Sequence, residues 1–372
     1  MESLLSHHNI NFISRRVLVN KHLEKFPIQS FQNSLIHWFK KEQRDLPWRR
    51  DPTPYEVWVS EIMLQQTKVE TVIPYYKHFL SKFPTLDTLA TAEEQEVLKA
   101  WEGLGYYSRA RNLQNAVREV VEQYGGSVPD TKEELGNLKG VGPYTQGAIL
   151  SIAFQKPEPA VDGNVMRVLS RILLITDDIA KGKTRSLFES IVRELISKND
   201  PSAFNQGLME LGALVCTPKS PSCLLCPVQE HCRAFKEGIQ ESLPVKSSKK
   251  VQAVVNYYVP IVKDDRGRVL IQQRPSTGLL ANLWEFPMIP IDTIEKDNMS
   301  LWYEAEYGLI ITNFQQIESI RHVFSHRIWD LQVGMCRLNG GALDHPSAMF
   351  TPLTELDTYP FPVSHQKIKK LL

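Results

Sequence analysis

Four of the five cysteines in this chain of 372 residues fall within one short segment. Their spacing is Cys216-x6-Cys223-x2-Cys226-x5-Cys232, and Cys336 stands apart. When four thiolates of one loop bind a single metal centre, the metal restricts the conformation of that loop. In a long chain expected to be cytoplasmic, this group indicates a metal site rather than a disulfide framework. Zinc sites usually present two Cys-x2-Cys pairs, and this segment has one, so the spacing favours an iron–sulfur cluster over zinc.

The composition is that of an ordinary folded protein. Hydrophobic residues make up 42% of the chain and charged residues 23%, and the length allows two or three domains. No apolar run is long enough to cross a bilayer, and the N-terminus lacks the apolar core of a secretory signal. We expect a cytoplasmic monomer without membrane contacts. The net charge of +1 does not by itself indicate a nucleic-acid partner, so DNA binding must depend on local motifs.

Hydrophobic periodicity divides the chain into parts. Residues 1–25 show no core pattern and are predicted to be a leader, whereas residues 26–235 repeat apolar side chains at helical spacing. A polar linker over 236–251 precedes a β-rich domain over 252–372. The predicted fold class is multidomain, with an all-α domain that carries the metal loop, followed by an α+β domain. The predicted strands of that second domain lie at 253–262, 269–273 and 329–335.

A glycine-rich turn precedes an apolar helix predicted over 144–154. Gly140 and Gly142 lie in the string Leu138-Lys-Gly-Val-Gly-Pro-Tyr-Thr145. Glycines allow a tight turn and a close approach to a ligand. The N-terminus of the helix that follows offers unpaired N–H groups to an anion. Such a turn can bind phosphate with few side-chain charges, although an ordinary helix–helix turn has a similar composition.

Another helix is predicted to begin after Asp162, in the string Val161-Asp-Gly-Asn-Val165. The simplest role for Asp162 is that of a helix N-cap. An aspartate there is expected to stay ionised, because the N-terminus of a helix favours negative charge. A capping aspartate can also be catalytic, so Asp162 is kept as a candidate catalytic residue together with Asn164.

Glu61 lies in the segment 58–67, which is predicted to be a helix that runs into a polar turn. Helical spacing places Glu61 on one face with Val57, Trp58 and Leu64. A carboxyl group on such an apolar face should have a raised pKa and stay protonated. This state suits a general acid. The alternative is a glutamate exposed to solvent or paired with an arginine.

The cysteine spacing and the turn at 138–145 together resemble the endonuclease III superfamily of DNA glycosylases. The resemblance implies a helix-hairpin-helix that binds DNA and a catalytic role for Asp162. It also implies that the cluster shapes a DNA-contacting loop and takes no part in cleaving the bond. The implied cofactor is a [4Fe–4S] cluster held by Cys216, Cys223, Cys226 and Cys232.

The string Ser60-Glu-Ile-Met-Leu-Gln-Gln-Thr67 is similar to one in MutY-type adenine glycosylases. The resemblance implies that Glu61 protonates N7 of adenine. Members of the superfamily that also cut the strand carry a lysine nucleophile where this chain has Tyr144. The resemblance therefore implies that Tyr144 supports the catalytic site and that the strand is left intact at an abasic site.

Further DNA contacts are expected where cations and aromatic rings cluster. The segment 44–49 precedes the Glu61 helix, and its Trp48 could equally be a core residue. In the segment 104–111, the resemblance implies that Tyr106 wedges into the base stack together with Gln66 and helps to extrude the target nucleotide. The residues expected to contact DNA in the helical part are Arg44, Trp48, Arg49, Gln65, Gln66, Thr67, Leu104, Tyr106, Gly140 and Gly142.

The last domain resembles the Nudix fold in the segment 278–287. Active Nudix hydrolases hold metal ions with a glutamate-rich helix, and the segment 301–308 keeps only part of that motif. Hydrolase activity is therefore not expected. The resemblance to the C-terminal domain of MutY proteins implies recognition of 8-oxoguanine by a loop that contains Phe324, Ser325 and His326.

Together these features imply an enzyme that removes adenine opposite 8-oxoguanine or guanine in double-stranded DNA. Three alternatives stay open. The first is a glycosylase that also cuts the strand, at oxidised pyrimidines, and Tyr144 argues against it. The others are a helix-hairpin-helix module that only binds DNA and a Nudix hydrolase of free nucleotides. Loss of adenine release in Glu61→Gln with DNA binding retained would exclude the silent module, and the incomplete glutamate motif argues against the hydrolase.

Overall fold

The computed structural model describes residues 17–247 and 252–372. These residues divide into two compact units, one formed by 17–69 and 119–247 and the other by 70–118 and 252–372. The division differs from the predicted one, which placed 70–118 in the helical domain. The reason lies in contacts between distant segments of the second unit, such as the hydroxyl of Tyr107, which donates to the carbonyl of Phe361 at 3.3 Å.

The first unit is helical, as predicted. Several of its helices begin at side-chain caps: Thr53 forms a capping box with Glu56, and Asp162 and Asp200 cap the helices that follow them. The α-helices are α2 (Ile28–Glu42), α3 (Pro54–Leu64), α8 (Lys132–Asn137), α9 (Pro143–Ile152), α10 (Gly163–Ile172), α11 (Gly182–Leu195), α12 (Pro201–Leu214) and α13 (Arg233–Lys236). Short 3-10 turns are η1 (Pro47–Arg49), η2 (Cys223–Leu225), η3 (Gln229–His231) and η4 (Gln240–Ser242).

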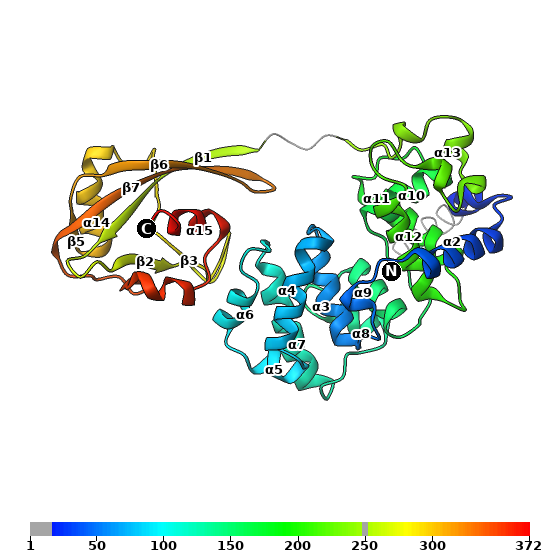
Figure 1. The fold of residues 1–372 in the computed structure, drawn as a ribbon, viewed down its shortest axis with the longest axis horizontal. Helices are drawn as coiled ribbons and strands as arrows, with labels where there is room; N and C mark the ends of the chain where they lie inside the picture. Colours follow the sequence, from blue (N-terminus) through cyan, green and yellow to red (C-terminus); the bar gives the residue numbers. More distant parts are fainter. Residues whose placement is uncertain (1–16, 248–251) are drawn as a thin grey trace, which may run out of the picture. The chain divides into compact units, whose positions relative to one another are not determined.

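One hydrophobic core holds much of this unit together. Helices α2 and α12, far apart in the chain, pack side by side in it (Figure 1). Val19 is buried in the same core, so the predicted leader is wrong over 17–25, and residues 1–16 lie outside the described residues. Leu243 is also buried, and its carbonyl accepts from Arg171. The first half of the predicted linker therefore belongs to this unit. The prediction missed this because the residues around Leu243 are mostly polar, and the single buried leucine gives no periodic pattern.

The second unit begins with helices α4 (Val69–Lys82), α5 (Leu86–Thr91), α6 (Glu94–Ala100) and the first part of α7 (Ser108–Gln123). Phe79 and Trp101 are fully buried among them and meet edge to face. Within this unit, Gln95 of α6 accepts a hydrogen bond from Trp284 Nε1 at 3.1 Å. Its amide donates to the carbonyl of Asn282 at 3.0 Å.

The remainder of the second unit is a mixed sheet with helices on both faces. The main strand order is β3-β2-β1-β7-β5. In addition, β4 pairs with β1, β6 with β7 and β8 with β2. Among these pairs the central one, β1–β7, is parallel and the others are antiparallel. The strands are β1 (Ala253–Lys263), β2 (Val269–Gln273), β3 (Trp284–Glu285), β4 (Ile289–Pro290), β5 (Leu309–Ile311), β6 (Gln315–Val323), β7 (Arg327–Gly341) and β8 (Ala348–Thr351). The α-helices are α14 (Met299–Tyr307) and α15 (Val363–Lys369), and the 3-10 turns are η5 (Lys296–Asn298) and η6 (Leu353–Thr358).

Alternating side chains of the sheet enter two separate cores. On β1, Ile261 faces the core that includes Ile368 of α15, and its neighbour Val262 faces the core that includes Tyr303 of α14. Figure 1 shows the two helices beside the strands they cover. The predicted α+β architecture is confirmed. None of the helices within the described ranges is both long and apolar enough to span a membrane.

Candidate active site

Glu61 is buried on helix α3, with 6% of its surface exposed. Its Oε2 atom accepts a hydrogen bond of 2.6 Å from the hydroxyl of Tyr144. Burial raises the pKa of Glu61 to about 7, although the Tyr144 hydrogen bond opposes this shift. Glu61 is thus a carboxyl group that can carry a proton near neutral pH, as its apolar helix face predicts.

Tyr144 reaches Glu61 from the first turn of α9, directly after the glycine-rich turn. Gly140 has a φ of +82°, which glycine adopts without strain, while Gly142 has an ordinary φ of −86°. Within α9, a Cβ atom on Gly147 would lie 1.9 Å from the carbonyl oxygen of Pro159. The helix therefore packs directly on the backbone that leads to Asp162, and this close approach sets Tyr144 beside the second carboxylate.

Asp162 is the N-cap of α10, as predicted, and accepts from the backbone N–H of Val165 at 2.7 Å. The side-chain amide of Asn164 donates to its other oxygen at 3.0 Å. The pKa of Asp162 is nevertheless raised above its ordinary value, because burial outweighs these hydrogen bonds. Asp162 is therefore less acidic than an ordinary N-cap aspartate, and the expectation that it stays ionised remains a prediction.

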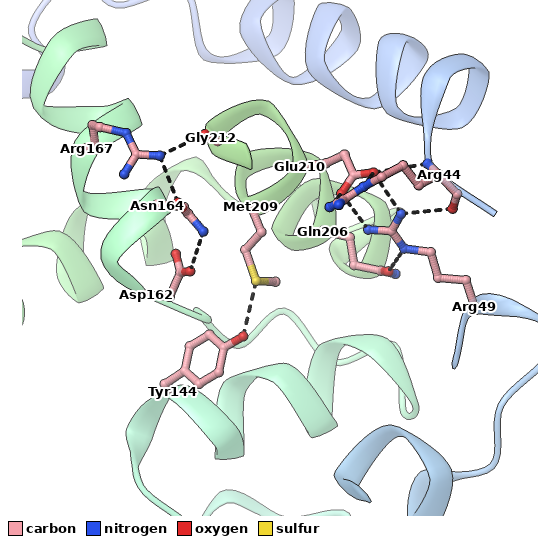
Figure 2. A network of polar contacts seen from close by, with 10 residues as sticks. All are labelled: Arg44, Arg49, Tyr144, Asp162, Asn164, Arg167, Gln206, Met209, Glu210 and Gly212. Carbon is pink, nitrogen blue, oxygen red and sulfur yellow. Dashed lines mark hydrogen bonds and ion pairs between the residues drawn. The ribbon is translucent and has the colours of Figure 1, made fainter. Parts of the chain in front are cut away.

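Asn164 joins the aspartate to a buried arginine. The Nη2 atom of Arg167 donates to Asn164 Oδ1 at 2.8 Å and to the carbonyl of Gly212 at 2.7 Å (Figure 2). The Nε atom of Arg167 donates to the carbonyl of Cys216 at 2.9 Å. A Cβ atom on Gly212 would lie 2.7 Å from Asn164 Cβ, so glycine permits the close packing of α12 on α10. The orientation of Asp162 thus depends on three segments of the chain.

Arg44 and Arg49 converge on Glu210, a residue that the sequence reasoning missed. Each guanidinium donates to both carboxylate oxygens, at distances of 2.7–3.0 Å (Figure 2). Glu210 is 1% exposed, and the two arginines hold its pKa down at about 2 despite its burial. The structure thus shows a buried partner for both arginines, while their contact with DNA remains a prediction.

A cavity of about 800 Å³, open to solvent, brings these groups together. Glu61, Tyr144 and Asp162 share its wall with Trp48, which is 6% exposed. Three of the lining residues that the sequence reasoning missed lie on α12, Glu210 among them. Their spacing of i, i+3 and i+4 places them on one face of that helix, a pattern that could have indicated them. They are Gln206, Met209 and Glu210 of α12.

The predicted wedge residues are exposed and have unusual backbones. Gln66 has a φ of +59° and Tyr106 a φ of +47°, in the left-handed region. The Tyr106 ring, 44% exposed, packs under the guanidinium of Arg109, and its hydroxyl is hydrogen-bonded to Ser325 in the same unit. Leu104 is 7% exposed and packs in the core, and its contact with DNA remains a prediction.

The remaining predicted contacts occupy turns and loops. Gln65 donates its amide to the hydroxyl of Thr145 at 3.2 Å, and Thr67 lines the catalytic cavity. In the second unit, Ser325 and His326 are exposed between β6 and β7, while Phe324 meets Trp329 edge to face. The Phe324 ring therefore anchors the loop that presents the other two side chains.

The four clustered cysteines line a single cavity of about 390 Å³ with apolar walls that include Val168 and Leu211. No three His, Cys, Asp or Glu side chains in the described parts of the chain are placed to hold a single metal ion. Four thiol donors at one apolar pocket are the ligand set of an iron–sulfur cluster. Arg171 fixes this loop by donating to the carbonyl of Thr217 at 2.8 Å and to Cys216 Sγ at 3.2 Å.

Three segments of the chain match family models. Residues 59–194 match the HhH-GPD superfamily of base excision DNA repair proteins, 216–232 the iron–sulfur binding domain of endonuclease III, and 258–371 a NUDIX domain. The adenine DNA glycosylase of Rattus norvegicus is 39% identical over 368 residues, which cover 84% of this chain and 71% of its own. That of Schizosaccharomyces pombe is 36% identical, covering 80% of each chain. The chain belongs to the adenine DNA glycosylase family.

The protein is therefore a DNA glycosylase of base excision repair, of the MutY type, with an iron–sulfur cluster and DNA as its partner. A solved structure supports the fold of the helical part. A thermostable thymine-DNA glycosylase aligns with a TM-score of 0.52 and 27% identity, covering 56% of this chain and 97% of its own. The predictions of fold class, enzyme class and cofactor are confirmed for this adenine DNA glycosylase family member.

Proposed function

We propose that the protein hydrolyses the N-glycosidic bond of adenine paired with 8-oxoguanine or guanine in double-stranded DNA. The observation that carries this proposal is the shared cavity of Glu61, Tyr144 and Asp162, two carboxyl groups and a phenol at one open pocket. The names of the relatives as adenine DNA glycosylases support adenine as the base removed.

The two carboxyl groups have different roles in the proposed reaction. Glu61, with a pKa of about 7, donates its proton to a ring nitrogen of the base, so that the base leaves as a neutral molecule. The electron pair of the broken C–N bond departs with the base, and Asp162 as carboxylate stabilises the cationic sugar. Water then adds to the sugar carbon and releases a proton, which completes the hydrolysis.

The proposed product is an abasic site in an intact strand. Strand cutting by a glycosylase uses an amine that attacks the sugar. Among the described residues that line the catalytic cavity there is no lysine, and the hairpin presents Tyr144 there instead. The arginines of the cavity are held by Glu210 and stay charged, so they are poor nucleophiles.

Recognition of the mispair is proposed to use exposed side chains of both units. The turn with Gly140 and Gly142 would bind phosphate, while Gln66 and Tyr106 would enter the base stack. Residues 252–372 would form the lesion-reading domain, with Ser325 as the hydrogen-bonding side chain for 8-oxoguanine. The exposure of Ser325 and its bond to Tyr106 support a common role for the two residues.

The proposal is tested with labelled duplexes that carry adenine opposite 8-oxoguanine, guanine, thymine or cytosine. Adenine release is expected opposite the two purines, and strand breaks only after alkali. Glu61→Gln is expected to bind the same duplexes without releasing adenine, which would exclude a module that only binds DNA. Activity on thymine glycol without activity on the adenine mispairs, or strand breaks before alkali, would contradict the proposal.

A further inference from the structure

The source of positive charge for DNA binding is not accounted for by the site described above. The net charge of the chain is only +1, and Arg44 and Arg49 are engaged with buried Glu210. A duplex nevertheless presents a dense row of phosphates to any protein that holds it. The turn at 138–145 can bind part of that row through backbone N–H groups, and exposed cations near the catalytic cavity can bind more of it.

A second hollow of about 1210 Å³ lies directly beside the catalytic cavity. Asp162 and Asn164 line both, so the two hollows meet at the N-terminus of α10. A deoxyribose held against Asp162 carries a phosphate on each side. The strand must therefore leave the cavity past this point, and the second hollow lies open beside it.

Three exposed cations line this hollow, which we call the basic groove: Lys181, Arg185 and Lys246. Lys181 and Arg185 lie at the beginning of α11, whose first turn contains no acidic residue. Lys246 comes from a distant segment, which a hydrogen bond of 3.0 Å from the N–H of Ile179 to the carbonyl of Val245 holds next to that helix. The tertiary structure thus gathers the three charges from two places in the chain.

The other charged groups around the groove are already engaged. Arg167 donates to Asn164 and to two backbone carbonyls, so it belongs to the support of Asp162. Asp162 is the only acidic residue among the described lining residues. Asp178, nearby, accepts from the N–H groups of Ala180 and Ser247 at 2.9 and 3.1 Å. The groove therefore keeps a net positive charge on its exposed side chains.

We infer that the basic groove binds phosphates of the DNA strand that contains the target nucleotide, next to its sugar. The inference rests on the proposed function for the place of that sugar at Asp162. Lys181, Arg185 and Lys246 are phosphate contacts in it and carry no base specificity.

The test measures how the affinity for a duplex depends on salt. Glu61→Gln serves as the background, so that substrate is not consumed. The triple variant Lys181→Gln, Arg185→Gln, Lys246→Gln is compared with a control triple, Lys21→Gln, Lys41→Gln, Lys198→Gln, which removes three exposed lysines outside the groove. Each lost phosphate contact is expected to reduce the slope of log K against log salt by about 0.9, so the groove triple should lose about 2–3.

The control triple should have the same slope as the background protein. The double variant Lys181→Arg with Lys246→Arg should also have this slope, because both positive charges remain. Equal slopes for the groove triple and the control would overturn the inference, and so would loss of the slope in the arginine variant. Circular dichroism melting identifies any loss of folding. The unmodified enzyme could release no adenine while the groove triple still shows a smaller slope of log K against log salt. This result would contradict the proposed substrate and support phosphate binding by the basic groove.

Discussion

At the scale of single residues, burial decides the chemistry of the catalytic cavity. Glu61 and Asp162 are both removed from water, and both pKa values rise, that of Glu61 to about 7. Two hydrogen bonds at the start of α10 stabilise Asp162 as a carboxylate, whereas Glu61 receives one from Tyr144. The two carboxyl groups thereby suit the two proposed roles, proton donation by Glu61 and stabilisation of positive charge by Asp162.

The first prediction concerns pH. Excision in a single turnover should fall as pH rises through about 7, because Glu61 then loses the proton that the base needs. The pKa of Glu61 is higher in the folded state than in the unfolded one, so the folded state should also lose on the order of 3 kcal/mol of stability between about pH 4.5 and 7. Rates and melting temperatures measured across this range check both effects. A rate that stays constant from pH 6 to 9 would contradict the role of Glu61.

The second prediction concerns the hydrogen bond from Tyr144. Tyr144→Phe removes a donor that favours the ionised form of Glu61, so the pKa of Glu61 should rise further. The falling limb of the pH–rate profile should move to higher pH, while the strand stays uncut. Tyr76→Phe, a buried tyrosine of α4, is the matched control and should leave the limb where it is. A shift of the limb to lower pH would show that the bond acts in the opposite sense.

At the scale of elements, contacts between helices set the distances within the site. Helix α9 approaches the chain before Asp162 at Gly147, and helix α12 approaches Asn164 at Gly212. Neither glycine has a positive φ, so the requirement comes from the neighbouring segment and not from the turn chemistry of glycine itself. Packing at these two points brings Tyr144, Asp162 and the α12 side chains to one cavity.

The third prediction compares two glycines of the same motif. Gly147→Ala places a Cβ atom 1.9 Å from a backbone oxygen, so the helix must shift. We expect a loss of about 2–4 kcal/mol in the free energy of unfolding and a large loss of excision. Gly142→Ala meets no atom of the protein within 4 Å and should keep its stability while binding DNA more weakly. Chemical denaturation and duplex titration separate the two outcomes, and equal stabilities would show that α9 can relax.

At the scale of the whole molecule, the cluster loop is part of the core of the first unit. Cys216, Cys226 and Cys232 pack against the same buried residues that include Val168 and Leu211. Burial raises the pKa of the Cys226 thiol to about 12, so it ionises at neutral pH only when it binds a metal. A cluster bound by these cysteines would cross-link the loop, and the proposed catalytic steps use the chain's own carboxyl groups.

The fourth prediction follows from this packing. Cys226→Ser should reduce cluster content and lower the melting temperature of the first unit, because a buried ligand and its cross-link are lost together. Cys336→Ser removes a thiol from the sheet of the second unit and should keep the cluster. Iron content and the visible absorption of the cluster report the difference. Full iron content in Cys226→Ser would contradict the four-cysteine assignment.

Much of the fold could be predicted because its signals are short in sequence. Caps such as Asp162, the β-rich run of β1 and the spacing of the cysteines each act within a few residues. Contacts that join distant segments of the chain could not be predicted. Leu104 is packed into a core, and Arg44 finds its carboxylate 166 positions away. The spacing of nearby residues in the sequence does not indicate such long-range partners.

By itself, the sequence determined the cluster loop, the hairpin, the helical and β-rich parts and the identity of both carboxyl groups. Only the tertiary structure decided that Arg49 binds Glu210, that the pKa of Glu61 reaches about 7, and that Lys181 and Lys246 share one groove. The reason is physical. Backbone propensity and ligand spacing are local properties, whereas burial and electrostatic pairing depend on which distant segments pack together.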